Sequence, residues 1–529
     1  MAKKIFTLLT CLVMLTSSFS ALADIARVSE EPLEFTFWAA YNPTYQSDWE
    51  KMKCWAYLEE ATGVHINWVL YANTDEMKEK LGILLASADT AAFPDAFFRT
   101  GISDSQLKKY GPEGLFLDMR PLVDEFAPNL SMRLTDMNAW AAVTDASSGA
   151  MYSTPCLIDS LASRMLPNLF LNRKMMDAVG WTGATPATTD ELYDLLVLIR
   201  DMDANGNGDL TDEVGITSNS LSRMLNLFSG AFGINNRGRD DLAVDADPAD
   251  ETKVRFVYTT EEYRAMLSYV NRLFAEKLID PSLFSLKTSD MVALGSQNQI
   301  FGLAYSNLEA ASVNAEDYVG LDTSFAGPEG YNGFNTLNSG ITLGSFVISS
   351  ACENPEALVK WIDNLYTLEG STLIYFGKEN VDFTYNADGL PTYTDELLSK
   401  VSADNPYDKV VSEVTCYASG GIPSWFNDAT FPGAQCRGTS LTAALNMEPY
   451  VNKQAWLFNF TTEENDELSA LKADIITNCH DVYRAKFITG ELNISDDAVW
   501  QEYLSKVEGL GLDDMMTLYQ AALDRMLAK

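Results

Sequence analysis

The chain has 529 residues, of which 47% are hydrophobic and 11% aromatic, enough to bury the cores of several domains and to exclude a disordered protein. Its 37 Lys and Arg residues against 74 Asp and Glu residues give a formal net charge of −37, which argues against nucleic acid and anionic membrane surfaces as partners. Carboxylates are so common that any two chosen as the acid and base of a glycosidase would be chosen from noise.

Residues 1–23 are typical of a secretory signal peptide. A basic start and an apolar run lead to Ala21-Leu-Ala23, a small-residue cleavage sequence in front of Asp24. We expect cleavage after Ala23 and a mature protein outside the cytoplasmic membrane. A lipoprotein signal at Cys11 is the less favoured alternative. No later run approaches the ~20 apolar residues that a membrane span needs.

Strands alternate with helices at the start of the mature chain. Leu33–Trp38, Val64–Tyr71 and Pro94–Phe98 have strand patterns, while one helix ends near Thr62 and another spans Thr74–Ser87. This alternation predicts a largely parallel sheet covered on both faces, which binds ligands at the carboxyl ends of its strands. Those ends are the segments 38–42, 71–73 and 99–101.

The pattern continues through the rest of the chain. A strand over Asn168–Asn172 precedes a short helix that ends at Gly180, and a capping box at Thr188 opens the next helix. Further elements are predicted at 261–276 (helix), 302–305 and 339–348 (strands) and 355–366 (helix), with three or four helices between 461 and 529.

The stretch from Asp203 to Glu213 reads as a calcium loop, because it interleaves acid and amide side chains with glycines, and Ca²⁺ takes about six to eight oxygen ligands. The candidate ligands are Asp203, Asn205, Asn207, Asp209 (through its backbone carbonyl), Asp212 and Glu213. Gly208 would make the turn, and Leu210 would face inward. Glu213 lies one place early for an EF-hand, so either Asp212 or Glu213 is bidentate. The alternative is an acidic Asn/Gly turn without a metal.

Cysteine and histidine patterns do not indicate catalysis. The six cysteines after residue 23 form no CxxC pair, and Cys416 with Cys436 is the pair to test for a disulfide. The two histidines, His65 and His480, lie far apart in sequence. This leaves no sequence-level case for a Ser-His-Asp triad, a Cys-His dyad or a His-rich zinc site, and we expect both to be structural.

Aromatic and planar polar side chains beside the predicted strand ends and loops are suited to a carbohydrate, which offers apolar C–H faces and a ring of hydroxyls. The candidate ligand-binding residues are Trp38, Tyr41, Asn42, Arg99, Tyr152, Tyr305 and Trp425. Core or surface packing is the competing explanation for each. Trp55, Trp68, Trp361 and Trp500 fall inside helix or strand patterns and are predicted to be core.

Several blocks, in order along almost the whole mature chain, resemble the extracellular solute-binding proteins of bacterial ABC importers, in the subgroup that includes alginate-binding proteins and sugar-binding lipoproteins. The blocks are Trp55–Trp68, Leu84–Asp89 with Pro94-Asp95, Leu171–Lys174 with Val179-Gly180, Pro186–Tyr193 leading to the Asp203 loop, Asn354–Asp363 with Tyr375–Gly377, Lys486–Gly490, Trp500–Tyr503 and Gly509–Leu512.

The resemblance implies an α/β, two-lobed periplasmic-binding-protein-like (type II) fold with a hinge and additional C-terminal helices. Lobe one would be 24–155 plus about 337–400, and lobe two 156–336 plus about 401–529, with hinge strands near 152–158 and 337–348. It also implies a structural Ca²⁺ in the loop at 203–213. Compared with the family, the loop has one extra residue before Asp212-Glu213, and Asp24 stands where many relatives have a lipidated cysteine.

The function expected from the resemblance is capture of a carbohydrate, an oligosaccharide in particular, between two lobes that close on it and deliver it to ABC permease subunits. No catalytic residues, no nucleic acid and no membrane span of the mature chain are expected, and the protein would be a monomer. The alternatives are a secreted enzyme acting on polysaccharide and a binding protein for a peptide or another non-sugar solute.

Overall fold

The computed structural model describes residues 25–528 except 42–45, 47, 73, 166–167, 236–242, 307, 309–312, 337–339, 388, 403–404, 406, 417–420, 431–435, 452–455 and 457. The predicted signal peptide at 1–23, the candidate Asn42 and the start of the second expected hinge segment therefore lie outside the described residues. The chain forms two compact units. Unit 1 comprises the residues up to Asn138, Ala150–Leu157 and Leu343–Phe426; unit 2 comprises Ala139–Gly149, Ile158–Thr342 and Asn427–Lys529.

The sheet of unit 1 is mixed, which corrects the expectation of a largely parallel one. Its strands lie in the order β14 (Trp425–Asn427), β4 (Thr154–Asp159), β11 (Ile341–Ile348), β3 (Ala96–Phe98), β1 (Leu33–Ala40), β2 (Val64–Tyr71). β1 pairs in parallel with β2 and β3, as the alternating pattern predicts. β11, which comes from far along the chain, is antiparallel to β3. Local alternation could not reveal this pairing.

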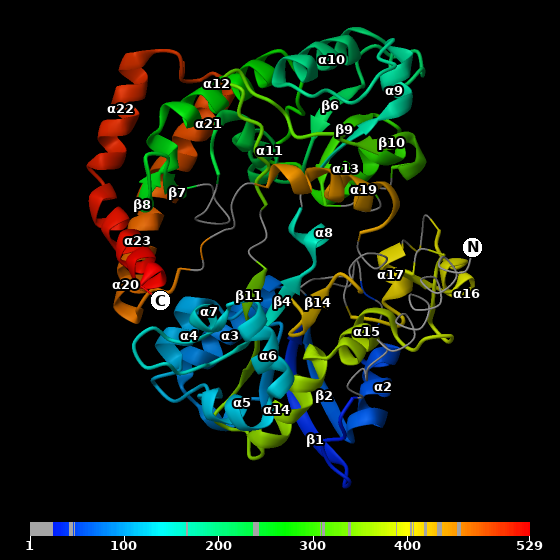
Figure 1. The fold of residues 1–529 in the computed structure, drawn as a ribbon, viewed down its shortest axis with the longest axis vertical. Coiled ribbons are helices and arrows are strands. Elements are labelled where there is room, and N and C mark those ends of the chain that lie inside the picture. Colours follow the sequence, from blue (N-terminus) through cyan, green and yellow to red (C-terminus); the bar gives the residue numbers. More distant parts are fainter. Residues whose placement is uncertain are drawn as a thin grey trace, which may run out of the picture. The chain divides into compact units, whose positions relative to one another are not determined.

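Successive side chains of a strand point to opposite faces of its sheet. In this sheet, side chains on each face pack into a core. On one face, Phe37 contacts Trp68 and Trp361 with ring centroids 5.6 and 5.5 Å apart. On the other face, Phe97 joins a cluster with Leu81 and Leu107. The helices of unit 1 include α2 (Lys53–Thr62), α3 (Thr74–Ser87), α4 (Asp104–Tyr110), α5 (Arg120–Phe126), α6 (Pro128–Asp136), α14 (Pro355–Asp363), α15 (Leu368–Phe376), α16 (Asp395–Leu398) and α17 (Tyr407–Val411). Among them α5, α6 and α14 pack side by side (Figure 1).

Three neighbouring strands of this sheet each contain a point where the chain passes from one unit to the other. The points are Leu157/Ile158 in β4, Thr342/Leu343 in β11 and Phe426/Asn427 in β14. The first two fall inside the segments expected to be hinge strands. The third comes later than the crossing expected near residue 400. β14 is only three residues long, too short to show a strand period in the sequence.

Unit 2 is built on a mixed sheet in the order β10 (Tyr318–Gly320), β5 (Asn168–Asn172), β9 (Ile300–Tyr305), β6 (Val214–Thr217). β6 and β9 are parallel, whereas β5 is antiparallel to both of its neighbours. Phe170, Ile300 and Leu303 form a core cluster of this sheet with residues that include Met291 of α13 (Thr288–Ser296) and Ala443 of α19 (Gly438–Met447). A hairpin of β7 (Val244–Asp247) and β8 (Asp250–Phe256) lies apart from it.

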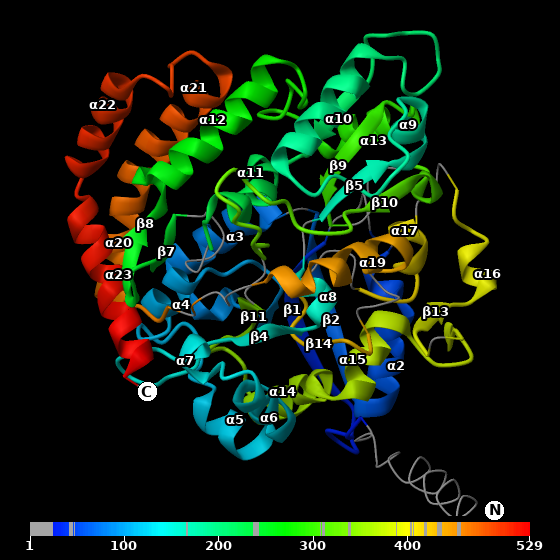
Figure 2. The ribbon, with the colours of Figure 1, turned by 45° about the horizontal axis from the view of Figure 1, so that its top comes forward.

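The remaining elements of unit 2 are mostly helical. They are α7 (Trp140–Val143), α8 (Leu161–Arg164), α9 (Arg173–Ala178), α10 (Thr189–Asp201), α11 (Leu221–Ser229), α12 (Glu261–Ala275), α20 (Thr462–Lys472), the π-helical η10 (Ala473–His480), α21 (Asp481–Thr489), α22 (Asp497–Glu508) and α23 (Leu512–Leu527). Figure 2 shows the C-terminal helices packed beside α12 and β8. Thr188 caps α10 through the N–H of Glu191, as predicted, although the Glu191 carboxylate accepts from Ala187 instead of closing the capping box.

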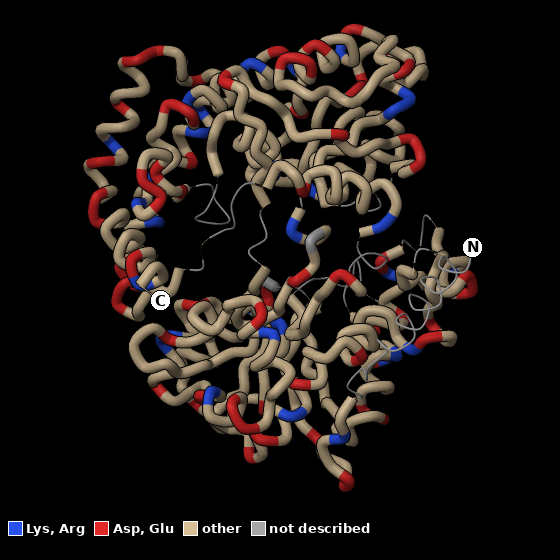
Figure 3. The backbone as a smooth tube through the Cα atoms, viewed as in Figure 1, with Lys and Arg blue, Asp and Glu red and all other residues tan. Residues whose placement is uncertain are grey.

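Acidic residues are distributed over both units, with basic residues interspersed (Figure 3). Within the described chain, no helix combines the length and the apolar character needed to cross a bilayer. None of the six cysteines that the structure describes forms a disulfide. Cys416 contacts Cys54 within unit 1, while Cys436, the partner we would have tested, belongs to unit 2.

A polar network of unit 2 surrounds His480, whose side chain is buried. Its ring stacks on Tyr258, with centroids 3.7 Å apart. Nδ1 lies 2.8 Å from the Tyr503 hydroxyl and Nε2 lies 3.1 Å from the Tyr263 hydroxyl. Tyr503 donates to the Tyr258 carbonyl, so its oxygen accepts from Nδ1–H, and Nε2 accepts from Tyr263. Burial, with a smaller effect of nearby Arg484, holds the pKa of His480 well below its usual value.

Acidification should therefore destabilise unit 2. In the unfolded chain His480 takes up a proton below about pH 6.5, whereas in the folded protein its side chain stays neutral. The free energy of unfolding therefore falls as the pH drops. Between pH 7.5 and 5.5 we expect His480 to account for a loss of about 1.4 kcal/mol in the free energy of unfolding. Urea titrations at both pH values should show this loss in the wild type and a smaller one in His480→Gln.

His65 provides the matched control with the opposite sign. Its ring is exposed and pairs with Glu59 at 2.9 Å, and this hydrogen bond raises the pKa of His65. Its contribution is therefore present below its unfolded pKa and is lost as the pH rises. His65→Gln should not reduce the acid sensitivity. Equal acid sensitivity of His480→Gln and the wild type would contradict the prediction.

Candidate functional site

The carboxyl ends of the three parallel-paired strands of unit 1 meet at one edge of its sheet. Arg99, directly after β3, donates from Nη1 to the Ala40 carbonyl at the end of β1, at 3.1 Å. The Tyr41 N–H donates to the Tyr71 carbonyl at the end of β2, at 2.9 Å. The sheet thus brings Tyr41 and Arg99 to one edge, together with Tyr71.

Arg99 is held at this edge in an unusual backbone conformation. Its φ is 56°, in the left-handed region that few non-glycine residues adopt. Its N–H donates to the Ser345 carbonyl of β11 at 2.7 Å, which fixes this turn. Burial lowers the pKa of Arg99 to about 10, so the guanidinium stays charged at neutral pH. A strained, partly buried cation at a strand end is typical of a binding site.

Other candidates of unit 1 make packing contacts. Trp38 points to the face of the cluster with Phe97, at 6.0 Å between centroids, and also contacts Tyr71 at 5.1 Å. Tyr152 packs against the same cluster, and a Cβ added at Gly111 would lie 2.6 Å from its ring. Packing therefore accounts for much of the surface of these two rings.

Trp425, at the start of β14, lies under a guanidinium. The Arg133 guanidinium of α6 lies 3.5 Å from the centre of the Trp425 ring, and the Trp425 carbonyl accepts from Ser371 at 2.7 Å. One face of the indole is thus already covered by a cation–π contact.

In unit 2 the corresponding edge lies where the parallel strands β6 and β9 end. Tyr305 ends β9, and the Arg223 guanidinium of α11 lies 4.5 Å from its ring centre. Arg223 donates to Asn219 at 2.7 Å, and Asn219 donates to Thr288 at 3.0 Å. These side chains are partly exposed and combine an aromatic ring with planar polar groups, as carbohydrate recognition requires.

Sequence reasoning missed Arg223 and Asn219. Both follow the carboxyl end of β6 within six residues, which is the available signal, but a strand of four residues is too short to show a clear period in the sequence. Each unit therefore presents its own polar and aromatic edge. Three of the four tryptophans predicted to be core, Trp55, Trp361 and Trp500, are buried. The fourth, Trp68, is only partly buried.

The loop from 203 to 213 follows α10 and is ordered by its own acid and amide side chains. Asp203 accepts from the N–H groups of Asn207 (3.0 Å) and Gly208 (2.9 Å), and Asn207 Oδ1 accepts from the Asp209 N–H at 2.7 Å. Gly208 has φ 91°, which a side chain would disfavour. Leu210 is 59% exposed, so the expectation that it faces inward is wrong. The Asp209 carboxylate accepts from Thr211 and forms a local turn.

The two acids at the end of the loop have different partners. Glu213 Oε1 accepts from the N–H groups of Ala204 (2.8 Å) and Asn205 (3.3 Å), across the loop. Asp212 accepts from Asn205, Asn207 and Gln299 side chains. Burial by itself would raise the pKa of Asp212, but these hydrogen bonds outweigh it and hold the pKa below its usual value.

The donor set suits a hard cation such as Ca²⁺, because every side chain of the set can present oxygen. Glu213 Oε2 is buried and has no hydrogen-bond partner among the described residues, so this carboxylate oxygen is free to bind a cation. Among the described residues, His, Cys, Asp and Glu side chains do not by themselves form a cluster of three with metal-binding spacing. Asn205 and Asn207 oxygens would have to complete the shell.

No family model matches the chain. It is 26% identical over 516 residues, covering 94% of the chain and 91% of the relative, to the fructooligosaccharide ABC transporter substrate-binding protein FusA of Streptococcus pneumoniae. The solved structure of S. pneumoniae FusA in complex with kestose has a TM-score of 0.74 at 24% identity, covering 94% of this chain and 99% of that chain. An EF-hand mutant of FusA in complex with fructo-nystose has the same TM-score at 23% identity, with the same coverage.

Alginate-binding protein AlgQ2, solved without calcium ion, has a TM-score of 0.73 at 18% identity, covering 95% of this chain and 100% of that chain. The similarity of these structures to the chain over nearly its whole length confirms the predicted α/β, periplasmic-binding-protein-like fold class. Together with the similarity to FusA along nearly the whole chain, they confirm the predicted resemblance to extracellular solute-binding proteins of ABC transporters.

The packing of Tyr152 generates a test of its role. Replacement by Ala should lower the free energy of unfolding by about 3 kcal/mol, because it removes a large ring from the cluster under α4. Urea denaturation measures this change. Tyr385→Ala is the matched control in unit 1: its side chain is 51% exposed, so the change should stay within about 0.5 kcal/mol. Two variants of equal stability would show that the Tyr152 ring does not support the core.

Proposed function

We propose that this chain, an extracellular solute-binding protein of the ABC-transporter type, binds an oligosaccharide and delivers it to permease subunits in the membrane. The observation that carries the proposal is the similarity to a fructooligosaccharide-binding protein over 94% of the chain. The edges of the two sheets support it: in unit 1 the Arg99 guanidinium donates to the Ala40 carbonyl next to Tyr41, and in unit 2 the Arg223 guanidinium lies over the Tyr305 ring. Fructose-containing oligosaccharides are the first ligands to test.

Specific roles follow from the contacts of each unit. Tyr41 and Arg99 would contact sugar at the edge of unit 1, with the Arg99 guanidinium donating to hydroxyl oxygens. Tyr305 would offer its ring in unit 2, and Arg223 would present donors beside it. Trp38, Tyr152 and Trp425 would contribute less to sugar binding, since packing already covers much of the surface of their rings.

Binding rather than turnover is favoured over the enzyme alternative. Both named relatives are binding proteins, and a hydrolase would need two carboxylates flanking a scissile bond. A peptide or another non-sugar solute remains the second candidate class, and direct comparison of ligands separates it. From the family resemblance we further expect the two lobes to close on the ligand. The ligand would shift the equilibrium toward the closed state because it binds that state more tightly than the open one.

We further propose that the loop from 203 to 213 binds a structural Ca²⁺. Glu213 would supply the buried oxygen that lacks a hydrogen bond, and Asp203, Asn205, Asn207 and Asp212 would supply the others. The ion would tie the end of α10 to the start of β6 and thereby add to the stability of unit 2.

Titration calorimetry of the mature protein should give saturable binding of kestose or nystose, with no product formed. Tyr41→Ala and Tyr305→Ala should each weaken the affinity about tenfold, which corresponds to about 1.4 kcal/mol. Tyr385→Ala should leave it unchanged. X-ray scattering should show a more compact particle with ligand. Binding of short peptides but of no sugar would refute the carbohydrate assignment, and release of shorter sugars would favour the enzyme.

Calcium should raise the melting temperature of protein stripped with EDTA, because a ligand that binds only the folded state stabilises it, by about 2.7 kcal/mol at 100 times its Kd. Glu213→Gln should abolish most of this rise. Asp250→Asn is the control, since Asp250 makes the same kind of turn contact, to Thr252, on an exposed hairpin of unit 2.

Elemental analysis after dialysis measures the bound ion directly. One calcium per chain in the wild type and in Asp250→Asn, and almost none in Glu213→Gln, is the expected pattern. If calcium raised the melting temperature of Glu213→Gln as much as that of the wild type, Asp212, and not Glu213, would be the essential acid of the loop. No calcium in any of the proteins would favour the metal-free turn.

A further inference from the structure

Arg223 of unit 2 lies at a position that is unfavourable for a cation. It is in the first turn of α11, where the N-cap Ser220 accepts from the Arg223 N–H at 3.4 Å. Positive charge in the first turn of a helix is unfavourable, because the N–H groups there already carry partial positive charge. The chain has 74 acidic residues against 37 basic ones, yet no carboxylate among the described residues pairs with Arg223. A residue that is locally unfavourable in this way points to a role in function.

Two side chains hold the Arg223 guanidinium in place. Its Nη1 donates to Asn219 Oδ1 at 2.7 Å, and its central carbon lies 4.5 Å from the centre of the Tyr305 ring. The hydrogen bond and the cation–π contact offset part of the unfavourable helix position. The other guanidinium nitrogens have no hydrogen-bond partner among the described residues and are not buried, so their N–H groups face solvent.

Asn219 is itself oriented from a second helix. Its Nδ2 donates to the Thr288 hydroxyl at 3.0 Å, and Thr288 is the first residue of α13. Because Oδ1 has to accept from Arg223, Nδ2 has to face Thr288, and the two bonds fix the amide in one orientation. Thr288 therefore acts on Arg223 through Asn219. We call these three residues the Arg223 network.

The elements that carry this network are anchored on one core cluster. Leu303 of β9 and Met291 of α13 belong to the cluster, and the Tyr305 ring packs against it. Tyr305 lies two residues after Leu303 and so points to the same face of the sheet. Thr288 lies three residues before Met291, on the same side of α13. α11 packs against β9. Packing of the sheet and both helices therefore fixes the place of each side chain.

We propose that Asn219 and Thr288 are positioning residues of the sugar site in unit 2, which hold the Arg223 guanidinium ready before a ligand arrives. Arg223 donates to sugar hydroxyl oxygens, and Thr288 sets the affinity without touching the sugar. Ordering a long side chain on binding costs free energy, and a guanidinium that is already held avoids much of that cost. The inference rests on the proposed binding of an oligosaccharide and assigns part of its affinity to the Arg223 network.

Titration calorimetry of the full mature chain with kestose and nystose tests the role of Thr288. Thr288→Val replaces the hydroxyl by a methyl group and should raise the Kd about threefold to tenfold, because Asn219 loses one of its two orienting bonds. Thr288→Ser keeps the hydroxyl and should bind like the wild type. Thr517→Val is the matched control on α23 of unit 2. Its exposed hydroxyl donates to the Asp513 carbonyl of the same helix, so the Kd should not change.

The order of the guanidinium can be measured without any ligand. Labelling of arginine with ¹⁵N gives Nε–H signals, and the signal lost in Arg223→Lys is that of Arg223. Its heteronuclear NOE should show a restricted side chain in the wild type and in Thr288→Ser, and a mobile one in Thr288→Val. The melting temperatures of the two Thr288 variants should stay close to that of the wild type. In an Arg223→Ala background, Thr288→Val should not weaken binding further, because the residue through which Thr288 acts is gone.

The inference and the proposed function can fail separately. Equal Kd values of the wild type and Thr288→Val would overturn the inference and leave the oligosaccharide assignment intact. A weakening that persists in the Arg223→Ala background, or that Thr288→Ser does not rescue, would also overturn it. If neither sugar binds the wild type, the proposed function fails for these ligands. A guanidinium that becomes mobile in Thr288→Val would then still support the positioning role, and one that stays restricted would overturn it.

Discussion

The structure of unit 1 depends on burying Phe37. Its side chain is fully inaccessible and contacts aromatic rings from four other elements: Trp68 of β2, Phe98 of β3, Phe346 of β11 and Trp361 of α14, at centroid distances of 5.6, 6.4, 5.5 and 5.5 Å. Aromatic pairs of this kind contribute about 0.5–1.5 kcal/mol each beyond their buried area. A one-residue slip of β1 would turn Phe37 to the opposite face, so these contacts also fix its register against β2 and β3.

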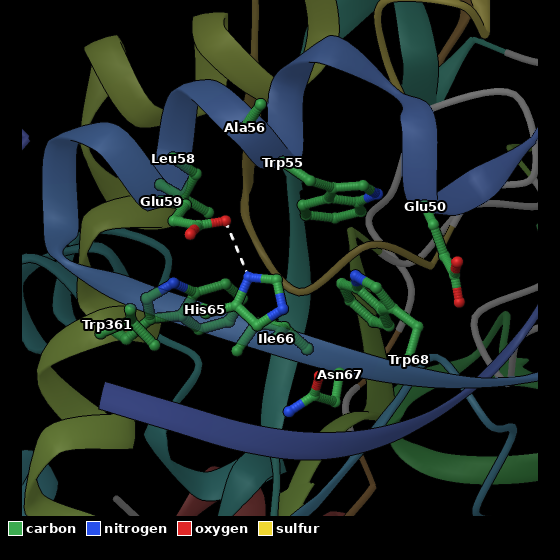
Figure 4. A pocket seen from close by; sticks show the side chains of 11 residues that line it. Glu50, Trp55, Ala56, Leu58, Glu59, His65, Ile66, Asn67, Trp68 and Trp361 are labelled. Atoms are coloured by element: carbon green, nitrogen blue, oxygen red, sulfur yellow. Dashed lines mark hydrogen bonds and ion pairs between the residues drawn. The ribbon is translucent and has the colours of Figure 1, made fainter. Parts of the chain in front are cut away.

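That register determines where polar groups can act. With β1 fixed between β2 and β3, the three strands end level with one another, and Arg99 reaches the Ala40 carbonyl. The same aromatic packing brings Trp55, Trp68 and Trp361 around a pocket of about 270 Å³ between α2 and the edge strand β2 (Figure 4). One cluster therefore positions the edge suited to polar recognition and also shapes the pocket beside the edge strand. Recognition at that edge is coupled to the stability of the same core.

Unit 2 contains one buried polar network whose hydrogen bonds are satisfied and one buried carboxylate oxygen that has no hydrogen-bond partner among the described residues. Around His480 both ring nitrogens are satisfied by tyrosine hydroxyls, which fixes the neutral form and makes the unit sensitive to acid. At the end of the loop from 203 to 213, Glu213 keeps one buried carboxylate oxygen without a partner among the described residues. A satisfied network adds rigidity, whereas an unsatisfied carboxylate calls for a cation. This difference is the physical basis for assigning a structural role to one and an ion to the other.

The sequence by itself determined the elements with strong local patterns: β1, β2, α3, β5 and α12 appear nearly as predicted, because alternation and helical periodicity act over neighbouring residues. It also determined the fold class and the family resemblance, through blocks spread along the chain. Only the tertiary structure decided that β11 runs antiparallel to β3, that Cys416 contacts Cys54, that β14 is a third crossing strand, and that Leu210 is exposed. It alone showed that Trp38 packs in a core while Trp68 lines a pocket, and that Arg223 lies beside Tyr305. The physical reason is that contacts between distant segments depend on the packing of the whole chain, and no pattern of neighbouring residues records them.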